Sequence, residues 1–214
     1  MIRVLIADDH QLVRDGLKQL LLAASGIGIV AEAANGDDVL AAVARAGPDV
    51  ALLDMSMPGL AGIALIKRLK LSYPGLRILV LSMHGERQYA ARALKAGASG
   101  YLTKDSASEQ LVSAIRKVAR GGIYITDAAA ASLMQGSASP DTAPHERLSD
   151  REFEVLRLLA AGHGPTEIAD QLHLSVKTVS THKTRILEKM NLANAADLVR
   201  YALQHNLLDA SPES

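Results

Sequence analysis

Five short apolar runs, each followed by a stretch with helical periodicity, fill the chain between residues 3 and 120. The runs read RVLIA, IVAEA, VALLD, RILVLS and GYLT. The helical stretches span His10–Ala24, Asp37–Ala46, Ala61–Tyr73, Glu86–Ala96 and Ser106–Arg120. Strands this uniformly apolar are buried on both faces, and the helices between them supply the right-handed crossovers of parallel strands. The pattern therefore predicts an α/β fold with a doubly wound, five-stranded parallel sheet.

The chain changes character after residue 120. A weak helical pattern gives way to a segment rich in Gly, Ser and Pro, which is typical of a flexible tether. From Leu148 onward the pattern is wholly helical, and Ser149 with Glu152 forms a capping box at the first helix. We therefore predict a first domain of residues 1–120, a linker of residues 121–147, a small all-α domain of residues 148–208 and a C-terminal tail of residues 209–214.

Composition narrows the classes of function. Lys plus Arg and Asp plus Glu both number 23, so a nucleic acid has to be met by a local patch and not by net charge. The 214 residues include no cysteine, which excludes disulfides, thiolate nucleophiles and zinc–cysteine sites. MIRVLIADD is charged too early for a secretory signal, and no apolar run approaches the roughly 18 residues of a membrane span. We expect a soluble, cytoplasmic protein without a membrane partner.

Charged and hydroxyl side chains follow the predicted strands at one edge of the sheet. Asp8 and Asp9 follow the first strand, Asp54 ends the third, Ser82 ends the fourth and Lys104 follows the fifth. In an open parallel sheet, ligands bind beyond the carboxyl ends of the strands, where the winding direction reverses. Carboxylates without Cys or a nearby His suit magnesium. We therefore expect a site for Mg²⁺ and a phosphate at this edge.

The all-α domain contains two helices with helix-turn-helix spacing. Thr166–Leu172 and Val176–Met190 are joined by the short turn His173–Ser175, and Ala169 is small where the helices must cross. The outward face of the second helix carries four cations and one acid, Glu188. This face is a local cationic patch, which the balanced net charge of the whole chain does not reveal.

The first domain resembles a receiver domain of bacterial two-component response regulators, whose fold is flavodoxin-like. The matching residues are the Asp8–Asp9 pair, Asp54 with Pro58 and Gly59, Ser82, and Tyr101-x-x-Lys104. The resemblance implies that Asp54 is a nucleophile that takes a phosphoryl group from a histidine kinase or a small donor such as acetyl phosphate. It implies that Asp9, Asp54 and the backbone carbonyl of Ser56 hold Mg²⁺, with Asp8 acting directly or through water.

The same resemblance assigns three further roles in the receiver. Lys104 would pair with a phosphoryl oxygen as a point charge. Ser82 would move toward the new phosphoryl group, and Tyr101 would turn inward into the space that Ser82 leaves. The chain would catalyse only its own phosphoryl transfer and dephosphorylation, so it is not otherwise expected to be an enzyme.

The helical domain resembles the LuxR-type helix-turn-helix domain, and the whole chain resembles a NarL/FixJ-family response regulator. The matching residues are Leu148-x-x-Arg151-Glu152, Glu167–Ala169, Thr178–Val179, His182 and Lys189–Met190. The resemblance implies a homodimeric transcription factor whose second helix enters the major groove of promoter DNA. Its DNA-contacting residues would be Lys177, Thr178, Ser180, Thr181, Lys183, Thr184, Arg185 and Lys189.

Three alternatives remain open on the sequence. An aspartate-nucleophile phosphohydrolase usually has a second Asp two residues after the nucleophile, where this chain has Ser56. A dinucleotide-dependent oxidoreductase would need a glycine-rich loop in the place of Asp8, Asp9 and His10. In the third, the first domain only dimerises and DNA binding is not controlled by phosphorylation. His182 has no second ligand at helical spacing, so we expect it to pack or to bond a phosphate.

Overall fold

The computed structural model describes residues 1–82, 87–125, 143–172, 174–205 and 207. The chain forms two compact units, Met1–Met134 and Gln135–Ser214. The predicted tail of residues 209–214 and most of the predicted linker lie outside the described residues.

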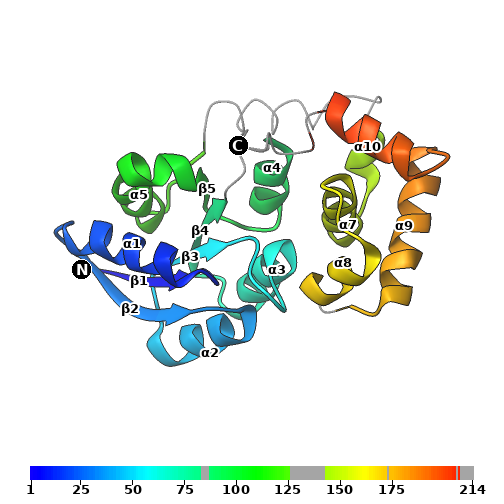
Figure 1. Cartoon of the computed structure of the whole chain (residues 1–214). Coiled ribbons are helices and arrows are strands. Elements are labelled where there is room, and N and C mark those ends of the chain that lie inside the picture. The colour runs from blue at the N-terminus through cyan, green and yellow to red at the C-terminus, as the bar shows by residue number, and fades with distance from the viewer. Residues whose placement is uncertain (83–86, 126–142, 173, 206, 208–214) are drawn as a thin grey trace. The chain divides into compact units, whose positions relative to one another are not determined.

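The first unit is built on a single parallel sheet with the strand order β2-β1-β3-β4-β5 (Figure 1). Its strands are β1 (Ile2–Ala7), β2 (Ile27–Ala33), β3 (Val50–Asp54), β4 (Arg77–Ser82) and β5 (Gly100–Thr103). The winding direction reverses between β1 and β3, which pair from Val4↔Val50 to Ala7↔Leu53. The prediction of a doubly wound five-stranded sheet is confirmed, and the strand ends at the reversal are those that carry the acids.

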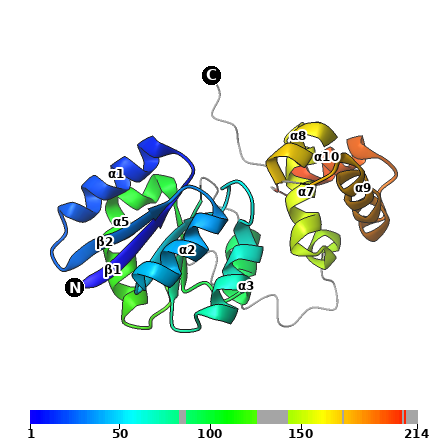
Figure 2. The ribbon, with the colours of Figure 1, turned by 90° about the horizontal axis from the view of Figure 1, so that it is seen from below.

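Helices cover both faces of this sheet. The helix α1 (Gln11–Leu22) and the helix α5 (Lys104–Ala119) lie on one face, and α2 (Gly36–Ala46) and α3 (Gly62–Ser72) lie on the other (Figure 2). The helix α4 (Arg87–Lys95) contacts α3 and β5. This arrangement explains why the strands are apolar throughout, since a strand with helices on both faces has no side exposed to water.

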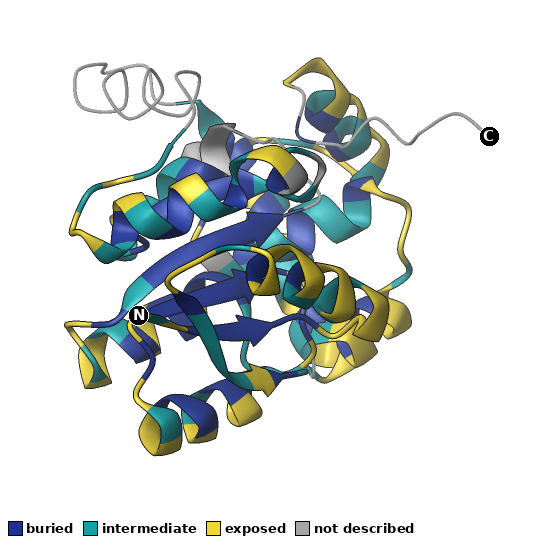
Figure 3. Ribbon diagram, turned by 90° about the vertical axis from the view of Figure 1, so that its left-hand side faces the viewer, coloured by how far each residue is buried: buried dark blue, intermediate teal, exposed yellow. Residues whose placement is uncertain are grey.

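The core of the first unit lies between the sheet and these helices, and the central strands are buried in Figure 3. Alternate strand residues such as Val4 and Ile6 join Leu21 of α1 and Ile115 of α5 in one cluster. Successive strand side chains point to opposite faces, so the intervening residues face α2 and α3. All five residues of β3 are buried, including the terminal Asp54.

The predicted linker is attached to a domain at both of its ends. Tyr124 forms an isolated parallel bridge with Gly100 of β5, so the first unit extends beyond residue 120. At the other end, the short 3₁₀ helix η1 (Pro144–Arg147) places His145 against Tyr201, with Nδ1 and the phenolic oxygen 2.6 Å apart. The predicted boundaries of 121 and 147 differ from the structure because these contacts are tertiary and leave no local pattern.

The second unit is helical throughout its described residues. Its helices are α7 (Asp150–Ala160), α8 (Pro165–Leu172), α9 (Val176–Met190) and α10 (Ala195–Gln204). They enclose a small core that includes Phe153, Ile168, Val179, Ile186 and Leu198, all 0% exposed. The predicted capping box of Ser149 and Glu152 is present. In both units, the helices of the described segments are too short or too polar to cross a membrane.

Ser175 fixes the start of α9. Its hydroxyl oxygen accepts a hydrogen bond from the Thr178 backbone N–H at 3.0 Å. The helix ends at Asn191, whose positive φ of 53° is a left-handed stop. Residue His173 of the predicted turn lies outside the described residues, but α8 and α9 contact each other as a helix-turn-helix pair.

Candidate functional site

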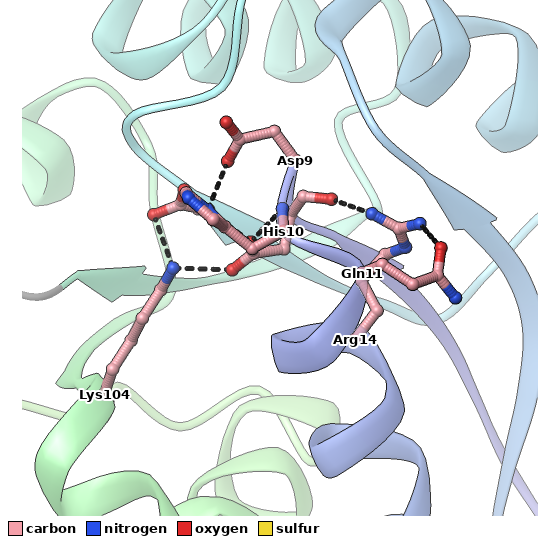
Figure 4. Close-up of polar contacts among 7 residues, drawn as sticks. Asp9, His10, Gln11, Arg14 and Lys104 are labelled. Atoms are coloured by element: carbon pink, nitrogen blue, oxygen red, sulfur yellow. Dashed lines mark hydrogen bonds and ion pairs between the residues drawn. The ribbon is translucent and has the colours of Figure 1, made fainter.

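Lys104 joins two buried carboxylates at the carboxyl edge of the sheet. Its Nζ lies 2.6 Å from Asp8 Oδ2 and 3.3 Å from Asp54 Oδ1 (Figure 4). Asp8 directly follows β1, Asp54 ends β3 and Lys104 begins α5 just after β5. Three separate strand ends therefore place these groups together, as the strand-end argument predicted.

Asp54 is the least satisfied of the charged groups. The residue is 2% exposed, and neither of its carboxylate oxygens accepts a hydrogen bond from the residues that the structure describes. Burial raises the pKa of the Asp54 carboxyl; the Lys104 ammonium opposes this rise, while Asp8 and Asp9 add to it. A buried carboxylate without hydrogen bonds is costly. Its unused lone pairs point to an electrophile or a cation as the missing partner.

Both carboxylate oxygens of Asp8 accept hydrogen bonds, in contrast to those of Asp54. Its Oδ1 accepts the His10 backbone N–H at 2.9 Å, and its Oδ2 accepts Lys104. Burial alone would lower the pKa of Lys104, but the hydrogen bond to Asp8 and the charge of Asp54 outweigh it and raise that pKa. Lys104 is therefore cationic at neutral pH and lies beside both acids.

Asp9 and His10 form the more exposed part of this edge. The Asp9 side chain is 31% exposed, and its Oδ1 lies 3.0 Å from His10 Nδ1. Ligand atoms of Asp8, Asp9 and His10 all lie within 4.8 Å of one another. The sequence analysis treated the acids as lacking a nearby His, and this was wrong, because His10 is adjacent to Asp9 in the chain.

The donor set fits Mg²⁺. Carboxylate oxygens dominate it, a hard cation prefers them, and the unbonded oxygens of Asp54 leave a coordination position open. Asp9 and Asp54 would be the ligands, together with the Ser56 carbonyl in the exposed turn after β3. Gly59 has a φ of 81°, a left-handed conformation that glycine adopts without strain, so Pro58–Gly59 turns the loop away from Asp54.

Ser82 lies on β4, the strand next to Asp54, and Tyr101 lies on β5, one strand further out. Leu81 of β4 pairs with Asp54, so Ser82 is one residue nearer the same edge, and it is 3% exposed. Tyr101 pairs with Val80 and is 4% exposed. Tyr101 is therefore buried in this structure, and its turn toward Ser82 after phosphorylation stays a prediction.

The helix α9 carries the cluster expected to contact DNA. Lys177, Ser180, Thr181, Thr184 and Arg185 are exposed, while Thr178 and Lys183 are intermediate. The opposite face, with Val179, Ile186 and Met190, is buried against the rest of the unit. The helix α9 thus exposes a hydroxyl-rich, cationic face, while its apolar face packs against the rest of the unit.

The hydroxyl groups of this face are already partly occupied. Ser180, Thr181 and Thr184 each donate to the carbonyl four residues earlier, at 3.0, 2.9 and 3.2 Å. In these rotamers they offer outward only acceptor lone pairs. Such groups discriminate bases less strongly than a bidentate arginine or asparagine.

Lys189 differs from the other cations of α9. Its Nζ lies 2.7 Å from Glu152 Oε2, and Glu152 is 3% exposed. The neighbouring Arg151 donates to the Leu172 carbonyl at the end of α8 at 2.5 Å. The Arg151–Glu152 pair thus ties α7 to both helices of the helix-turn-helix, a role that the sequence analysis did not identify.

His182 lies on α9 between the exposed face and the core. Its Nδ1 is buried and has no hydrogen-bond partner in the segments that the structure describes. Burial lowers the pKa of the His182 imidazole, and the charges of Arg151 and Arg185 lower it further against the opposing effect of Glu152. The residue is therefore neutral at physiological pH, which agrees with a packing role.

Two family models match the chain. Residues 4–116 match the response regulator receiver domain, and residues 146–202 match the bacterial regulatory proteins of the luxR family. The chain is therefore a two-component response regulator with a receiver domain and a LuxR-type DNA-binding domain. It belongs to the NarL/FixJ family, as predicted from the sequence.

Relatives resemble the chain over nearly its full length. The oxygen regulatory protein NreC of Staphylococcus carnosus (strain TM300) is 40% identical, with 97% of this chain and 99% of NreC covered. Salmonella typhimurium RcsB has a TM-score of 0.75 at 31% identity, with 95% of this chain and 97% of RcsB covered. A structure of two RcsB dimers bound to two parallel DNAs matches with a TM-score of 0.60 at 31% identity, covering 94% and 98%.

Proposed function

We propose that Asp54 accepts a phosphoryl group and that this modification controls the binding of the chain to promoter DNA. The observation that carries the proposal is the buried Asp54 carboxylate, which lies 3.3 Å from Lys104 and accepts no hydrogen bond within the described part of the chain. The donor would be a cognate histidine kinase or a small phosphodonor such as acetyl phosphate.

In the transfer step an Asp54 carboxylate oxygen attacks the phosphorus atom. The new bond joins that oxygen to phosphorus, and the bond from phosphorus to the leaving group breaks. The leaving group, a histidine imidazole or acetate, departs with the electron pair. Mg²⁺, when bound, neutralises charge between the phosphate and the carboxylates. Asp9, Asp54 and the Ser56 carbonyl would hold it, with Asp8 acting directly or through water.

Lys104 supplies a second positive charge to the same step. Its ammonium lies between Asp8 and Asp54, so a small movement brings it to a phosphoryl oxygen while it keeps its bond to Asp8. Such a charge-assisted bond is short and strong. Ser82 would then move toward the phosphoryl group, and the buried Tyr101 ring would turn into the space that Ser82 leaves.

The output of this switch would be DNA binding by a homodimer through α9. Ser180, Thr181 and Thr184 would face base edges, and Lys177, Thr178 and Lys183 would mostly contact phosphates, with Arg185 able to do either. The ion pair of Lys189 with Glu152 leads us to assign Lys189 to the stability of the domain instead. RcsB, a relative, has been solved as dimers on DNA. Half-sites would lie roughly ten base pairs apart.

The test is selection of genomic DNA fragments by the purified full-length chain. The arms are with and without acetyl phosphate and Mg²⁺, for the wild type, for Asp54→Asn and for Asp37→Asn, an exposed acid outside the site. We expect paired half-sites to be enriched only when the phosphodonor is present and Asp54 is intact. Equal enrichment in every arm would mean that the receiver does not control DNA binding.

An intact-mass measurement accompanies the selection. We expect the wild type and Asp37→Asn to gain one phosphoryl group and Asp54→Asn to gain none. Turnover of phosphate esters by the wild type would instead favour the phosphohydrolase alternative, which Ser56 in the place of a second acid argues against.

A further inference from the structure

The chain that leaves the receiver returns to the edge strand β5 before it continues to the DNA-binding unit. The Tyr124 backbone N–H donates to the Ser99 carbonyl at 3.0 Å, and the Tyr124 carbonyl accepts the Tyr101 N–H at 2.9 Å. These two backbone hydrogen bonds, called here the Tyr124 clasp, pair Tyr124 with Gly100 in parallel. One of them is made by Tyr101, the residue assigned to the switch.

The clasp depends on a glycine in β5. A Cβ atom built on Gly100 would lie 2.7 Å from the Tyr124 carbonyl oxygen and 2.8 Å from Leu79 Cδ1. Both distances are too short for a side chain, and one of the two neighbours is backbone. Gly100 therefore permits an approach that alanine at this position would prevent.

The Tyr124 side chain is held by α5, the helix that begins at Lys104. Its hydroxyl donates to Gln110 Oε1 at 2.8 Å, and Lys117 Nζ lies 5.7 Å from the ring centroid. The half-buried ring packs against the core cluster under α5. Tyr124 thus contacts both the strand that holds Tyr101 and the helix that starts at the phosphate-facing lysine.

From this geometry we propose that Tyr124 is a positioning residue that couples Tyr101 to the chain leading to the DNA-binding domain. The clasp is docked in a structure in which Tyr101 is buried, so conditions that hold Tyr101 inward also hold Tyr124 on β5. Phosphorylation of Asp54 therefore tightens the clasp of Tyr124 on β5. This inference rests on the proposed function, in which Tyr101 responds to the phosphoryl group.

Hydrogen exchange at the Tyr101 and Tyr124 amides of the full-length chain tests the coupling. We expect acetyl phosphate with Mg²⁺ to slow exchange at both amides by about fivefold or more in the wild type. The extent of phosphorylation is measured on the same samples by intact mass. Unchanged exchange in a phosphorylated sample overturns the proposal, whereas a wild-type sample that takes up no phosphoryl group instead contradicts the proposed function.

Two variants test the coupling, one at the backbone clasp and one at the side chain that holds Tyr124 against α5. Gly100→Ala blocks the backbone approach, and Tyr124→Phe removes only the hydrogen bond to Gln110. Their controls are Gly75→Ala, where nothing lies within 4 Å of an added Cβ, and Tyr73→Phe, a tyrosine outside the clasp. We expect both clasp variants to be phosphorylated to the wild-type extent and to lose at least half of the protection gained at Tyr101.

DNA binding gives the functional readout. For a fragment enriched in the selection above, the ratio of affinities with and without acetyl phosphate should fall by about fivefold in Gly100→Ala and stay unchanged in the controls. If Gly100→Ala disturbs folding, the coupling is judged from the conservative variant Tyr124→Phe. A wild-type affinity ratio and wild-type protection in Tyr124→Phe would show that its side chain does not position the switch.

Discussion

Two buried carboxylates, one in each unit, are satisfied in opposite ways. Glu152 of α7 is 3% exposed, and its Oε2 accepts the Ser149 N–H, the Ser149 hydroxyl and Lys189 Nζ at 2.8, 2.8 and 2.7 Å. Asp54 of β3 is 2% exposed and, among the described residues, has no hydrogen-bond donor to either oxygen. The Glu152 carboxylate therefore stabilises the fold of its unit, whereas the Asp54 carboxylate is available to react or to bind a cation.

The pKa values of the two acids follow from this difference. Burial alone would raise the pKa of Glu152, but its bonds to Lys189 and Ser149 outweigh burial and lower that pKa. Burial raises the pKa of Asp54, and Lys104 offsets the rise only in part. The two pKa values therefore shift in opposite directions, because hydrogen bonds outweigh burial at Glu152, whereas burial and the neighbouring Asp8 and Asp9 outweigh Lys104 at Asp54.

The largest effect on stability is expected from Glu152→Gln. The change removes the charge that holds Lys189 and disrupts the capping box, so the free energy of unfolding of the second unit should fall by about 2 kcal/mol. Hydrogen exchange of the α7 and α9 amides measures it in the full chain. Glu188→Gln on the exposed face of α9 is the control and should change stability by less than about 0.5 kcal/mol. An equal loss in both variants would contradict the structural role of Glu152.

The pH dependence of the same unit provides a second check on Glu152. Because its folded pKa is lowered, the carboxylate stabilises the fold above the unfolded value, near 4.5. That contribution should be lost as pH falls through the lower folded value. Glu152→Gln should therefore flatten the loss of α7 protection in acid.

The matching amide substitution in the first unit, Asp54→Asn, should have the opposite sign. An acid whose pKa is raised in the fold costs stability once pH exceeds that pKa, and the amide removes this cost. We expect the free energy of unfolding of the first unit to rise by about 1 kcal/mol at pH 7, measured by exchange of the β3 amides. A clear destabilisation would mean that Asp54 has a structural role like that of Glu152.

Two lysine substitutions on α9 distinguish a lysine that contacts DNA from a lysine that stabilises the fold. Lys183→Met should reduce the slope of log affinity against log salt by about 1, because a phosphate contact releases counterions. Lys189→Met should leave the slope nearly unchanged and lower the stability of the second unit by about 1 kcal/mol, since Lys189 is bound to Glu152. If both variants changed the slope equally, Lys189 would be assigned again to the residues that contact DNA.

The smallest effect concerns His182. Its pKa is lowered in the fold, so the unfolded chain binds a proton first as pH falls below about 6.5, and stability declines with it. In His182→Gln this decline should be weaker between about pH 5 and pH 7, as measured by exchange in α9. An unchanged pH profile would show that burial of this imidazole does not contribute to the decline.

Local features of the sequence were enough to predict most of the fold. The strands β3, β4 and β5 and the helix α9 have the predicted bounds, because apolar runs and capping residues such as Ser175 act within a few residues. The strand-end rule also predicted that Asp8, Asp54 and Lys104 lie at one edge of the sheet, as the structure shows. Both results depend only on periodicity and on the direction of parallel strands.

The two-unit organisation, the acidic edge and the cationic helix could be predicted before folding was considered, since each follows from neighbouring residues or from a repeated pattern. How the charges pair depends on the folded chain. Lys104 reaches Asp8 across 96 positions, Lys189 reaches Glu152 across 37, and Tyr124 returns to Gly100 at an edge that the sequence left open. The physical reason is that an ion pair or a backbone bridge depends on distance in space, and contacts across such separations leave no periodic trace along the chain.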